Sequence, residues 1–292
     1  MIEVAKRRFP DWMRRALPTR PALQTHEILN RFRLNTVCES ALCPNRSECY
    51  SRNTATFMIL GNVCTRRCGF CAIESGRPEP VEADEPQRVA RAAEELGLEY
   101  VVITSVARDE MPDEGAGHFA RTVRAVKETI PGVKVEVLTP DFHARPELIG
   151  LVVEAGPEVY NHNLETVERL QKAVRPQASY ARTLEVMRVI KSLAPGIKTK
   201  SGLMLGLGEK REEVYRAARD LRNAGCEILT LGQYLAPSTD HLPVLEFLSP
   251  EDFSAMAEDL KPLGFLEVFA GPYVRSSYHA GETFLNAAAG EF

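Results

Sequence analysis

Short apolar runs alternate with segments of helical periodicity along the chain from about residue 55 onward. The runs are rich in Val, Ile, Leu and Thr, and they predict six β-strands, at 56–60, 100–104, 134–138, 158–161, 197–205 and 228–232. Apolar residues in the intervening segments recur every three or four positions, as in the stripe Phe119, Val123, Val126 and Ile130, which we expect to face the core. Strands and helices that alternate in this way are typical of a parallel sheet with right-handed helical crossovers.

The number of strand–helix units limits the kind of barrel that they can form. Six units are too few to close an eight-stranded barrel, so we predict an α/β fold with an open, partial (β/α)6 barrel. The barrel core is expected at 55–234, with an N-terminal extension at 1–54 and a C-terminal extension at 235–292. In barrels of this kind, the chemistry is carried by loops at the C-terminal ends of the strands.

The composition is typical of a soluble globular protein, since 44% of the 292 residues are hydrophobic and 26% are charged. The longest apolar runs, such as LIGLVV at 148–153, are much too short to span a bilayer, and the first residues lack the apolar segment of a signal peptide. We therefore expect a cytoplasmic protein without a membrane partner. The net charge of −4 argues against a nucleic-acid partner, although the basic residues among the first twenty suit either a solvated tail or a contact with an acidic protein.

Six of the seven cysteines lie within residues 38–71, in two groups of three. The first trio is Cys38, Cys43 and Cys49, and the second trio is Cys64, Cys68 and Cys71. Because cytoplasmic thiols are kept reduced, this clustering indicates a metal centre and not a set of disulfides. The second trio directly follows the predicted strand at 56–60, at the end of the barrel where active sites lie. The isolated Cys226 precedes an apolar strand and is predicted to be a buried structural thiol.

The number of cysteines in each trio bears on which metal they hold. A structural zinc ion normally takes four protein ligands, and no histidine lies close to either trio, although a zinc ion shared between the trios stays an alternative. A four-iron cluster takes one thiolate per iron, so three cysteines leave one iron open to a further ligand. The spacing C-x3-C-x2-C in the second trio places three thiolates on one tight loop, which favours an iron–sulfur cluster.

The stretch CTRRCGFC at 64–71, which follows a predicted strand, resembles the signature of the radical S-adenosylmethionine enzymes. The order and spacing of further motifs resemble the lipoyl synthase family, from about residue 30 to residue 280: NTVCESALCPN, TFMILGNVCTRRCGFCAI, NHNLETV, KSGLMLGLGE, LTLGQYLAPS and VRSSYHA. The chain departs from the family pattern in ARDEMPDEGAGHF at 107–119, where Glu110 and Glu114 stand in place of the expected Asp and Gly.

This resemblance implies two [4Fe-4S] clusters with different tasks. The second trio would hold the cluster whose open iron binds S-adenosylmethionine, which is then cleaved to a 5′-deoxyadenosyl radical. The first trio would hold an auxiliary cluster with Ser277, or alternatively Ser276, as its fourth ligand. The auxiliary cluster would donate two sulfur atoms, at C6 and C8 of an octanoyl group bound to a lysine of a carrier protein. Two molecules of S-adenosylmethionine would be consumed for each lipoyl group.

The resemblance also implies contacts with S-adenosylmethionine at the strand ends, for which the candidate residues are Thr104, Ser105, Glu136, Asn161, Arg175 and Gly206. A structural hydrogen bond explains each of the polar residues equally well, and simple turn geometry explains the glycine. We expect His162 and His279 to hold hydrogen-bonded positions, because a radical mechanism makes little use of proton transfer.

The resemblance also implies partners. They are the octanoylated lipoyl carrier domains of 2-oxoacid dehydrogenases and the H protein of glycine cleavage, an electron donor such as ferredoxin or flavodoxin, and an iron–sulfur carrier that repairs the consumed cluster. The alternatives are another radical S-adenosylmethionine enzyme with an auxiliary cluster, and a non-catalytic electron carrier or metal module. Ser277 separates these alternatives, because a sulfur-donating cluster needs a labile corner and an electron carrier does not.

Overall fold

The computed structural model describes residues 10–13 and 20–289. The basic residues Lys6, Arg7, Arg8, Arg14 and Arg15, which would form a charged tail or partner contact, lie outside the described residues. Every helix in the described part of the chain is too short or too polar to cross a membrane.

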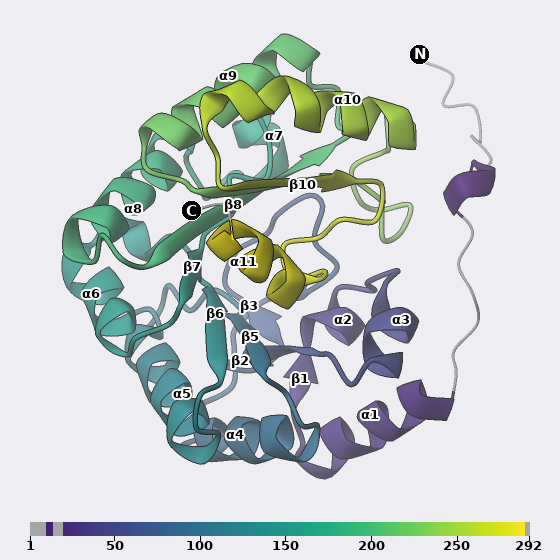
Figure 1. Ribbon diagram of the computed structural model, residues 1–292. Coiled ribbons are helices and arrows are strands. Elements are labelled where there is room, and N and C mark those ends of the chain that lie inside the picture. The colour runs from purple at the N-terminus through teal and green to yellow at the C-terminus, as the bar shows by residue number, and fades with distance from the viewer. Residues whose placement is uncertain (1–9, 14–19, 290–292) are drawn as a thin grey trace.

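A single curved sheet forms the centre of the molecule (Figure 1). Its strands, in spatial order, are β1 (Asn35–Thr36), β2 (Thr56–Ile59), β5 (Tyr100–Ser105), β6 (Lys134–Leu138), β7 (Val159–Asn161), β8 (Lys198–Leu205), β9 (Ile228–Gln233) and β10 (Glu267–Gly271). Strands β2 to β10 are parallel to their neighbours, and β1 pairs with β2 in the antiparallel direction. The six predicted strands are confirmed, and β1 and β10 are the two ends of the described sheet.

Amphipathic helices cover the outside of the sheet (Figure 1). These are α4 (Glu85–Glu95), α5 (Ala116–Thr129), α6 (Pro146–Glu154), α8 (Tyr180–Leu193), α9 (Arg211–Asn223) and α10 (Pro250–Leu260). The predicted stripe on α5 is confirmed, because Phe119, Val123 and Val126 are fully buried. Helix against parallel sheet is the layer arrangement expected for an α/β fold.

The two extensions supply shorter elements. The N-terminal part contains α1 (Arg20–Arg31), α2 (Val37–Ser40) and α3 (Arg46–Ser51), and the C-terminal part ends in α11 (Ala280–Ala289). The remaining elements are β3 (Val63–Cys64), β4 (Glu74–Ser75), α7 (Gln171–Val174) and the 3-10 turns η1 (Asp11–Met13), η2 (Phe142–Ala144), η3 (Glu168–Leu170) and η4 (Lys261–Leu263). Phe284 of α11 packs on Tyr100, the first residue of β5, with ring centroids 5.7 Å apart. Helix α11 therefore lies at the end of the sheet opposite to the strand C-termini.

The seventh parallel strand, β10, was not predicted from the sequence. It lies within 235–292, where only an extension was expected, and its five residues EVFAG are all half-buried. Such a short segment shows no clear period of two, and Gly264 and Gly271 are more typical of a loop than of a strand. Its pairing with β9, from Glu267 opposite Ile228 to Gly271 opposite Gly232, is set by tertiary contact. The sheet is thus two strands wider than predicted, with β10 at one end and the two-residue antiparallel β1 at the other.

A charged pair is buried between the strands. The Lys200 ammonium of β8 lies 2.9 Å and 3.0 Å from the two carboxylate oxygens of Glu136 on β6, and both residues are 1% exposed. The Glu136 carboxylate also accepts hydrogen bonds from the Tyr100 hydroxyl, at 2.8 Å, and from the Asn161 amide, at 3.0 Å. The ion pair and the two additional hydrogen bonds offset the cost of removing both charges from water. Loss of either residue would leave the other charge buried without a partner of opposite charge.

We expect Lys200→Met to lower the free energy of unfolding by about 3–5 kcal/mol, because it leaves the Glu136 charge buried without its cation. Denaturant unfolding followed by circular dichroism measures this loss. The matched control is Lys127→Met, which breaks the half-exposed pair with Glu158 and should cost at most about 1 kcal/mol. Equal losses in the two variants would contradict this interpretation of the buried pair.

Candidate functional site

One cavity of about 470 Å³ lies at the C-terminal ends of the strands, and both cysteine trios line it. All six of these cysteines, and Cys226, are free thiols in the described structure. The lining includes residues from the N-terminal extension, from the strand ends of the barrel core and from the segment 274–278 of the C-terminal extension. Segments that are far apart in the sequence therefore meet at a single site. Cys226 lies outside this cavity and is fully buried, as predicted.

The second trio lies on a loop whose backbone is fixed on several sides. The Cys64 sulfur accepts hydrogen bonds from the backbone N–H groups of Arg66, at 3.4 Å, and Ala107, at 3.3 Å. Between Cys68 and Cys71, the Gly69 N–H donates to the Val174 carbonyl at 2.9 Å, and the Gly69 carbonyl accepts from Leu242 at 3.0 Å. A Cβ on Gly69 would lie only 2.9 Å from a methyl carbon of Leu242, so a larger residue here would have to displace the Leu242 side chain.

The Arg66 side chain anchors the same loop to the barrel. Its guanidinium is 7% exposed and lies 2.6 Å from the Asp109 carboxylate and 2.8 Å from the Asp141 carboxylate. Asp141 also pairs with Arg182 of α8, at 3.1 Å. Burial alone would raise the pKa of Asp141, but the hydrogen bonds and positive charge of Arg66 outweigh it and lower that pKa below its usual value. Two charged carboxylates therefore hold the loop that carries the second trio.

The first trio lies on the two short helices α2 and α3 and the turn between them. Thr36 caps α2 by accepting a hydrogen bond from the Glu39 N–H at 3.3 Å, and Cys38 is buried in its first turn. The Cys43 N–H donates to the Cys38 carbonyl at 3.1 Å, which folds the turn back toward α2. Cys49 lies on α3. The cysteines separated by x4 and x5 are thus brought to one side of the cavity.

The donor set of each trio fits an iron–sulfur cluster better than a single zinc ion. Four sulfur ligands on one zinc lie about 3.8 Å apart, because each Zn–S bond is about 2.3 Å long. In the described part of the chain, Asp109, Glu114 and His143 form the group whose ligand atoms lie within 4.8 Å of one another, and neither cysteine trio is drawn together so closely. Each trio supplies only three of the four ligands that a structural zinc ion takes, and the cavity of about 470 Å³ beside them has room for a group larger than one ion.

Burial keeps three of these thiols, those of Cys38, Cys68 and Cys71, protonated when no metal is bound. It raises the pKa of Cys38 to about 12, with a further contribution from Cys43, and it raises the pKa of Cys71 to about 12. Burial also raises the pKa of Cys68. Thiolates are the form that binds iron, so metal binding at either trio must release protons.

Two glycines allow the C-terminal segment to reach the cavity. A Cβ on Gly232 of β9 would overlap the Val274 carbonyl, and a Cβ on Gly202 of β8 would lie 3.2 Å from the Ser276 hydroxyl. The Ser276 hydroxyl exchanges hydrogen bonds of 2.9 Å and 2.6 Å with the Asn163 amide. Ser277 also lines the cavity, and its hydroxyl has no hydrogen-bond partner among the described residues. Of the two candidate serines, Ser277 is therefore the one whose oxygen is available.

Three of the residues considered for S-adenosylmethionine contacts line the cavity, namely Thr104, Ser105 and Arg175. Thr104 uses its hydroxyl to bond the Leu138 carbonyl at 2.9 Å. The buried Ser105 hydroxyl and the buried Nε of Arg175 have no hydrogen-bond partner in the described structure. Buried polar groups without partners are rare, and these two atoms at the cavity are free to bond to a polar ligand.

The other three candidates, Glu136, Asn161 and Gly206, do not line the cavity. Glu136 and Asn161 belong to the buried network around Lys200. Gly206 has a φ of +101°, and the space beside its Cα is filled by the Gln233 amide and the Glu246 carbonyl. The structure gives these three residues internal contacts that shape the barrel around the cavity.

The histidines are hydrogen-bonded, as predicted. His162 donates from Nδ1 to the Thr139 carbonyl at 2.9 Å, and its Nε2 lies 3.2 Å from the Thr183 hydroxyl. Burial, followed by the charge of Arg175, lowers the pKa of His162 to about 4, so this ring is neutral at physiological pH. His279 pairs with Glu282 at 2.8 Å.

Asn163 and Glu165 line the cavity and were not singled out from the sequence. Glu165 has a φ of +67°, a left-handed conformation that is unusual for a residue other than glycine and is often found at functional sites. Burial raises the pKa of its carboxyl group, although Arg175 opposes the rise, and the carboxylate accepts a hydrogen bond from Asn163 at 3.0 Å. Both residues directly follow β7, at the C-terminal edge of the sheet. This position in the sequence could have identified them as candidate site residues.

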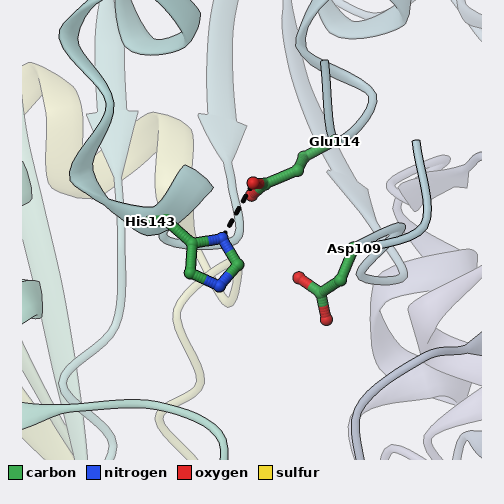
Figure 2. A group of neighbouring side chains, drawn as sticks. All are labelled: Asp109, Glu114 and His143. Carbon is green, nitrogen blue, oxygen red and sulfur yellow. Dashed lines mark hydrogen bonds and ion pairs between the residues drawn. The ribbon is translucent and has the colours of Figure 1, made fainter. Parts of the chain in front are cut away.

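The unusual acidic segment lies beside the loop of the second trio. Figure 2 shows Asp109, Glu114 and His143 pointing toward one another, with Glu114 bonded to Nδ1 of His143 at 2.8 Å. Glu114 also pairs with Arg145 at 3.1 Å, and Asp109 pairs with Arg66. Because an arginine already balances each carboxylate, we interpret this group as a salt-bridge network.

Glu114 has a φ of +48°, where the family pattern led us to expect glycine. We expect Glu114→Gly to be more stable than Glu114→Ala by about 1 kcal/mol, because both remove the carboxylate but only glycine adopts this conformation without strain. Chemical unfolding of the two variants measures the difference. An alanine variant as stable as the glycine variant would show that the backbone relaxes at this position.

The model of the radical SAM superfamily matches residues 58–221, which include the second trio. The chain is 51% identical over 282 residues to a lipoyl synthase of Rubrobacter xylanophilus, covering 96% of this chain and 88% of that protein. It is 52% identical to a lipoyl synthase of Caldanaerobacter subterraneus, covering 94% of this chain and 96% of that protein. It is 53% identical to a lipoyl synthase of Thermus thermophilus, covering 98% of this chain and 89% of that protein.

Solved structures of lower identity show the same fold. Methylornithine synthase is 17% identical, with a TM-score of 0.56 over 79% of this chain and 68% of that chain. Coproporphyrinogen III oxidase of Escherichia coli, a radical SAM enzyme, is 11% identical, with a TM-score of 0.51 over 69% of this chain and 51% of that chain. The relatives cover nearly the whole chain, and the family model covers the core that carries the second trio. The chain belongs to the lipoyl synthase family of radical S-adenosylmethionine enzymes.

Proposed function

We propose that this enzyme inserts two sulfur atoms, at C6 and C8, into an octanoyl group carried on a protein lysine, and that an auxiliary iron–sulfur cluster donates them. The observation that supports the proposal is the meeting of two cysteine trios and Ser277 in one cavity. Acid–base side chains cannot open unactivated C–H bonds, so the difficult chemistry belongs to cofactors. When bound, a reduced cluster with S-adenosylmethionine supplies a carbon-centred radical, and the auxiliary cluster supplies sulfide.

The second trio would hold the radical-generating [4Fe-4S] cluster. Cys64, Cys68 and Cys71 would hold this cluster through three thiolates, which would leave one iron free to bind S-adenosylmethionine. The protein offers further polar groups to this ligand, namely the unpartnered Ser105 hydroxyl and the unpartnered Nε of Arg175. The buried carboxylate of Glu165 would accept hydrogen bonds from hydroxyl or ammonium groups of the same ligand. Thr104 would bind through its backbone, since its hydroxyl is used.

The first trio would hold the auxiliary [4Fe-4S] cluster, with Ser277 as fourth ligand. The Ser276 hydroxyl is occupied by Asn163, which favours Ser277 over Ser276. A serine oxygen is a harder ligand than a thiolate and suits iron–sulfur clusters less well. The serine corner would therefore detach more readily than the three cysteine corners, which would hold the remainder of the cluster.

The cavity has walls that suit an acyl chain between the two trios. Apolar lining residues include Val37, Leu42, Met58, Leu138, Met204 and Val274. These side chains would keep the octanoyl chain in line and exclude water. Alignment matters because an error of about 1 Å in the position of a reacting carbon can reduce the rate about a hundredfold.

The proposed partners follow from this reaction. The substrate would be an octanoylated lipoyl carrier domain of a 2-oxoacid dehydrogenase or the H protein of glycine cleavage. Ferredoxin or flavodoxin would supply electrons, two molecules of S-adenosylmethionine would be used per lipoyl group, and an iron–sulfur carrier would rebuild the auxiliary cluster. Reduced thiols and clusters require a reducing compartment, so we place the reaction in the cytoplasm.

An anaerobic reaction of the reconstituted enzyme tests this function. The reaction contains S-adenosylmethionine, a strong reductant and an octanoyl-lysyl peptide, and mass spectrometry follows the peptide and 5′-deoxyadenosine. The proposal predicts a peptide with two added sulfur atoms. Release of 5′-deoxyadenosine with a sulfur-free peptide would indicate a different radical S-adenosylmethionine reaction, and release of neither would contradict the radical assignment.

A further inference from the structure

The segment that carries Ser277 has no regular secondary structure of its own. Residues 272–279 form turns between β10 and α11, held locally by backbone bonds from Val274 to Gly271, at 3.0 Å, and from Tyr278 to Arg275, at 3.0 Å. Turns of this kind do not fix a side chain against a distant part of the chain. The position of the Ser277 hydroxyl relative to the first trio must therefore depend on side-chain contacts.

Two such contacts join this segment to the residues between Cys43 and Cys49. The Asn45 amide, 1% exposed, donates to the Tyr273 carbonyl at 2.7 Å. The Tyr278 hydroxyl donates to the Glu48 carboxylate at 2.9 Å. Glu48 directly precedes Cys49, and Tyr278 directly follows Ser277. In the C-terminal segment, the two contacts lie before and after Ser277, at Tyr273 and Tyr278. In the N-terminal extension, they lie between Cys43 and Cys49.

The Tyr278 ring is fixed from two further sides. It stacks on Phe269 of β10, with centroids 6.4 Å apart and an angle of 16° between the rings. The neighbouring His279 ring meets it edge-on at 4.1 Å, and Nε2 of His279 lies 3.5 Å from the Glu48 carboxylate. The Glu48 carboxylate thus contacts two side chains of the C-terminal segment, those of Tyr278 and His279.

We propose that Asn45 and Glu48 are positioning residues that hold Ser277 against the first trio. We call the Asn45–Tyr273 and Glu48–Tyr278 contacts the Ser277 clamp. The contacts themselves are features of the fold, and their role at an auxiliary cluster rests on the proposed function. Because the clamp does not include the Ser277 hydroxyl, it keeps the C-terminal segment in place whether or not that hydroxyl is a ligand. The serine corner can then be labile without release of the segment.

Hydrogen exchange of the metal-free protein tests the clamp without reference to any cluster. Tyr278→Phe removes one hydroxyl and keeps the ring that stacks on Phe269. We expect amide exchange in residues 273–279 to become about tenfold faster, because a hydrogen bond to a charged carboxylate is lost. The matched control is Tyr215→Phe, which removes a hydroxyl bonded to Asp259 and should leave residues 273–279 unchanged. Unchanged exchange in Tyr278→Phe would overturn the clamp.

Iron release tests the role of the clamp at the first trio. In protein that also carries Cys64→Ala, Cys68→Ala and Cys71→Ala, a chelator should remove iron about tenfold faster after Glu48→Ala or Tyr278→Phe. Glu48→Gln keeps an oxygen that accepts from Tyr278, so it should release iron at nearly the parent rate. Glu48→Ala at the parent rate, with Ser277→Ala faster, would overturn the positioning role. If Ser277→Ala has no effect, the ligand assignment of the proposed function fails, while hydrogen exchange still decides the clamp.

Discussion

Cys38→Ala is expected to abolish sulfur insertion while 5′-deoxyadenosine is still released from S-adenosylmethionine. Cys38 is buried in α2 and supplies one of three thiols of the first trio, whereas the second trio is unchanged in this variant. Without Cys38, the proposed auxiliary cluster would lose one of its three cysteine ligands, and with it the proposed source of sulfur. Mass spectrometry of the octanoyl-lysyl peptide should show sulfur products at background level.

The matched control for this variant is Cys226→Ala. Cys226 is also a fully buried free thiol, but it lies outside the cavity and bonds the Ile228 carbonyl at 3.3 Å. Its replacement should leave sulfur insertion in place. Sulfur insertion by Cys38→Ala at the level of Cys226→Ala would contradict a role of the first trio as a cluster site.

The combined replacement of Cys64, Cys68 and Cys71 by alanine is expected to abolish both products. The proposed radical-generating cluster would then have no cysteine ligands, so neither 5′-deoxyadenosine nor sulfur-containing peptide should form. The first trio stays intact, so the protein should still bind iron, which metal analysis checks as a control for folding. Release of 5′-deoxyadenosine at the rate of the unaltered enzyme would contradict the assignment of the second trio.

Features that depend on neighbours in the sequence were predicted well. The strands at 56–60, 100–104 and 134–138 are local runs of apolar residues, and each is present in the structure. The cysteine trios are equally local, because the second trio lies on one loop and the first trio spans only two short consecutive helices and the turn between them. Burial of the α5 stripe followed from its helical period.

Features that depend on distant contacts were not predictable from the sequence. Strand β10 is defined by its pairing with β9, and its own five residues show no strand pattern. The sequence shows Glu136 only as a polar residue within a predicted strand. The fold shows that its carboxylate forms a buried ion pair with Lys200. The contact between Asn45 and Tyr273 joins residues 228 positions apart, so no local pattern reports it.

The left-handed backbone conformations at and beside the site were also not predictable from the sequence. Glu165 lies in a motif that was used only for its resemblance, and its left-handed φ became visible with the structure. Glu114 was identified as a departure from the family pattern, but its pairing with Arg145 and His143 depends on how the loops after β5 and β6 meet.

The isotopic origin of the inserted sulfur identifies the donor. The unaltered enzyme is reconstituted with sulfide enriched in a heavy sulfur isotope, freed of excess sulfide, and mixed anaerobically with unlabelled S-adenosylmethionine, reductant and octanoyl-lysyl peptide. If the cluster held by Cys38, Cys43, Cys49 and Ser277 is the donor, the product carries two heavy sulfur atoms. A product that carries only light sulfur would contradict this account.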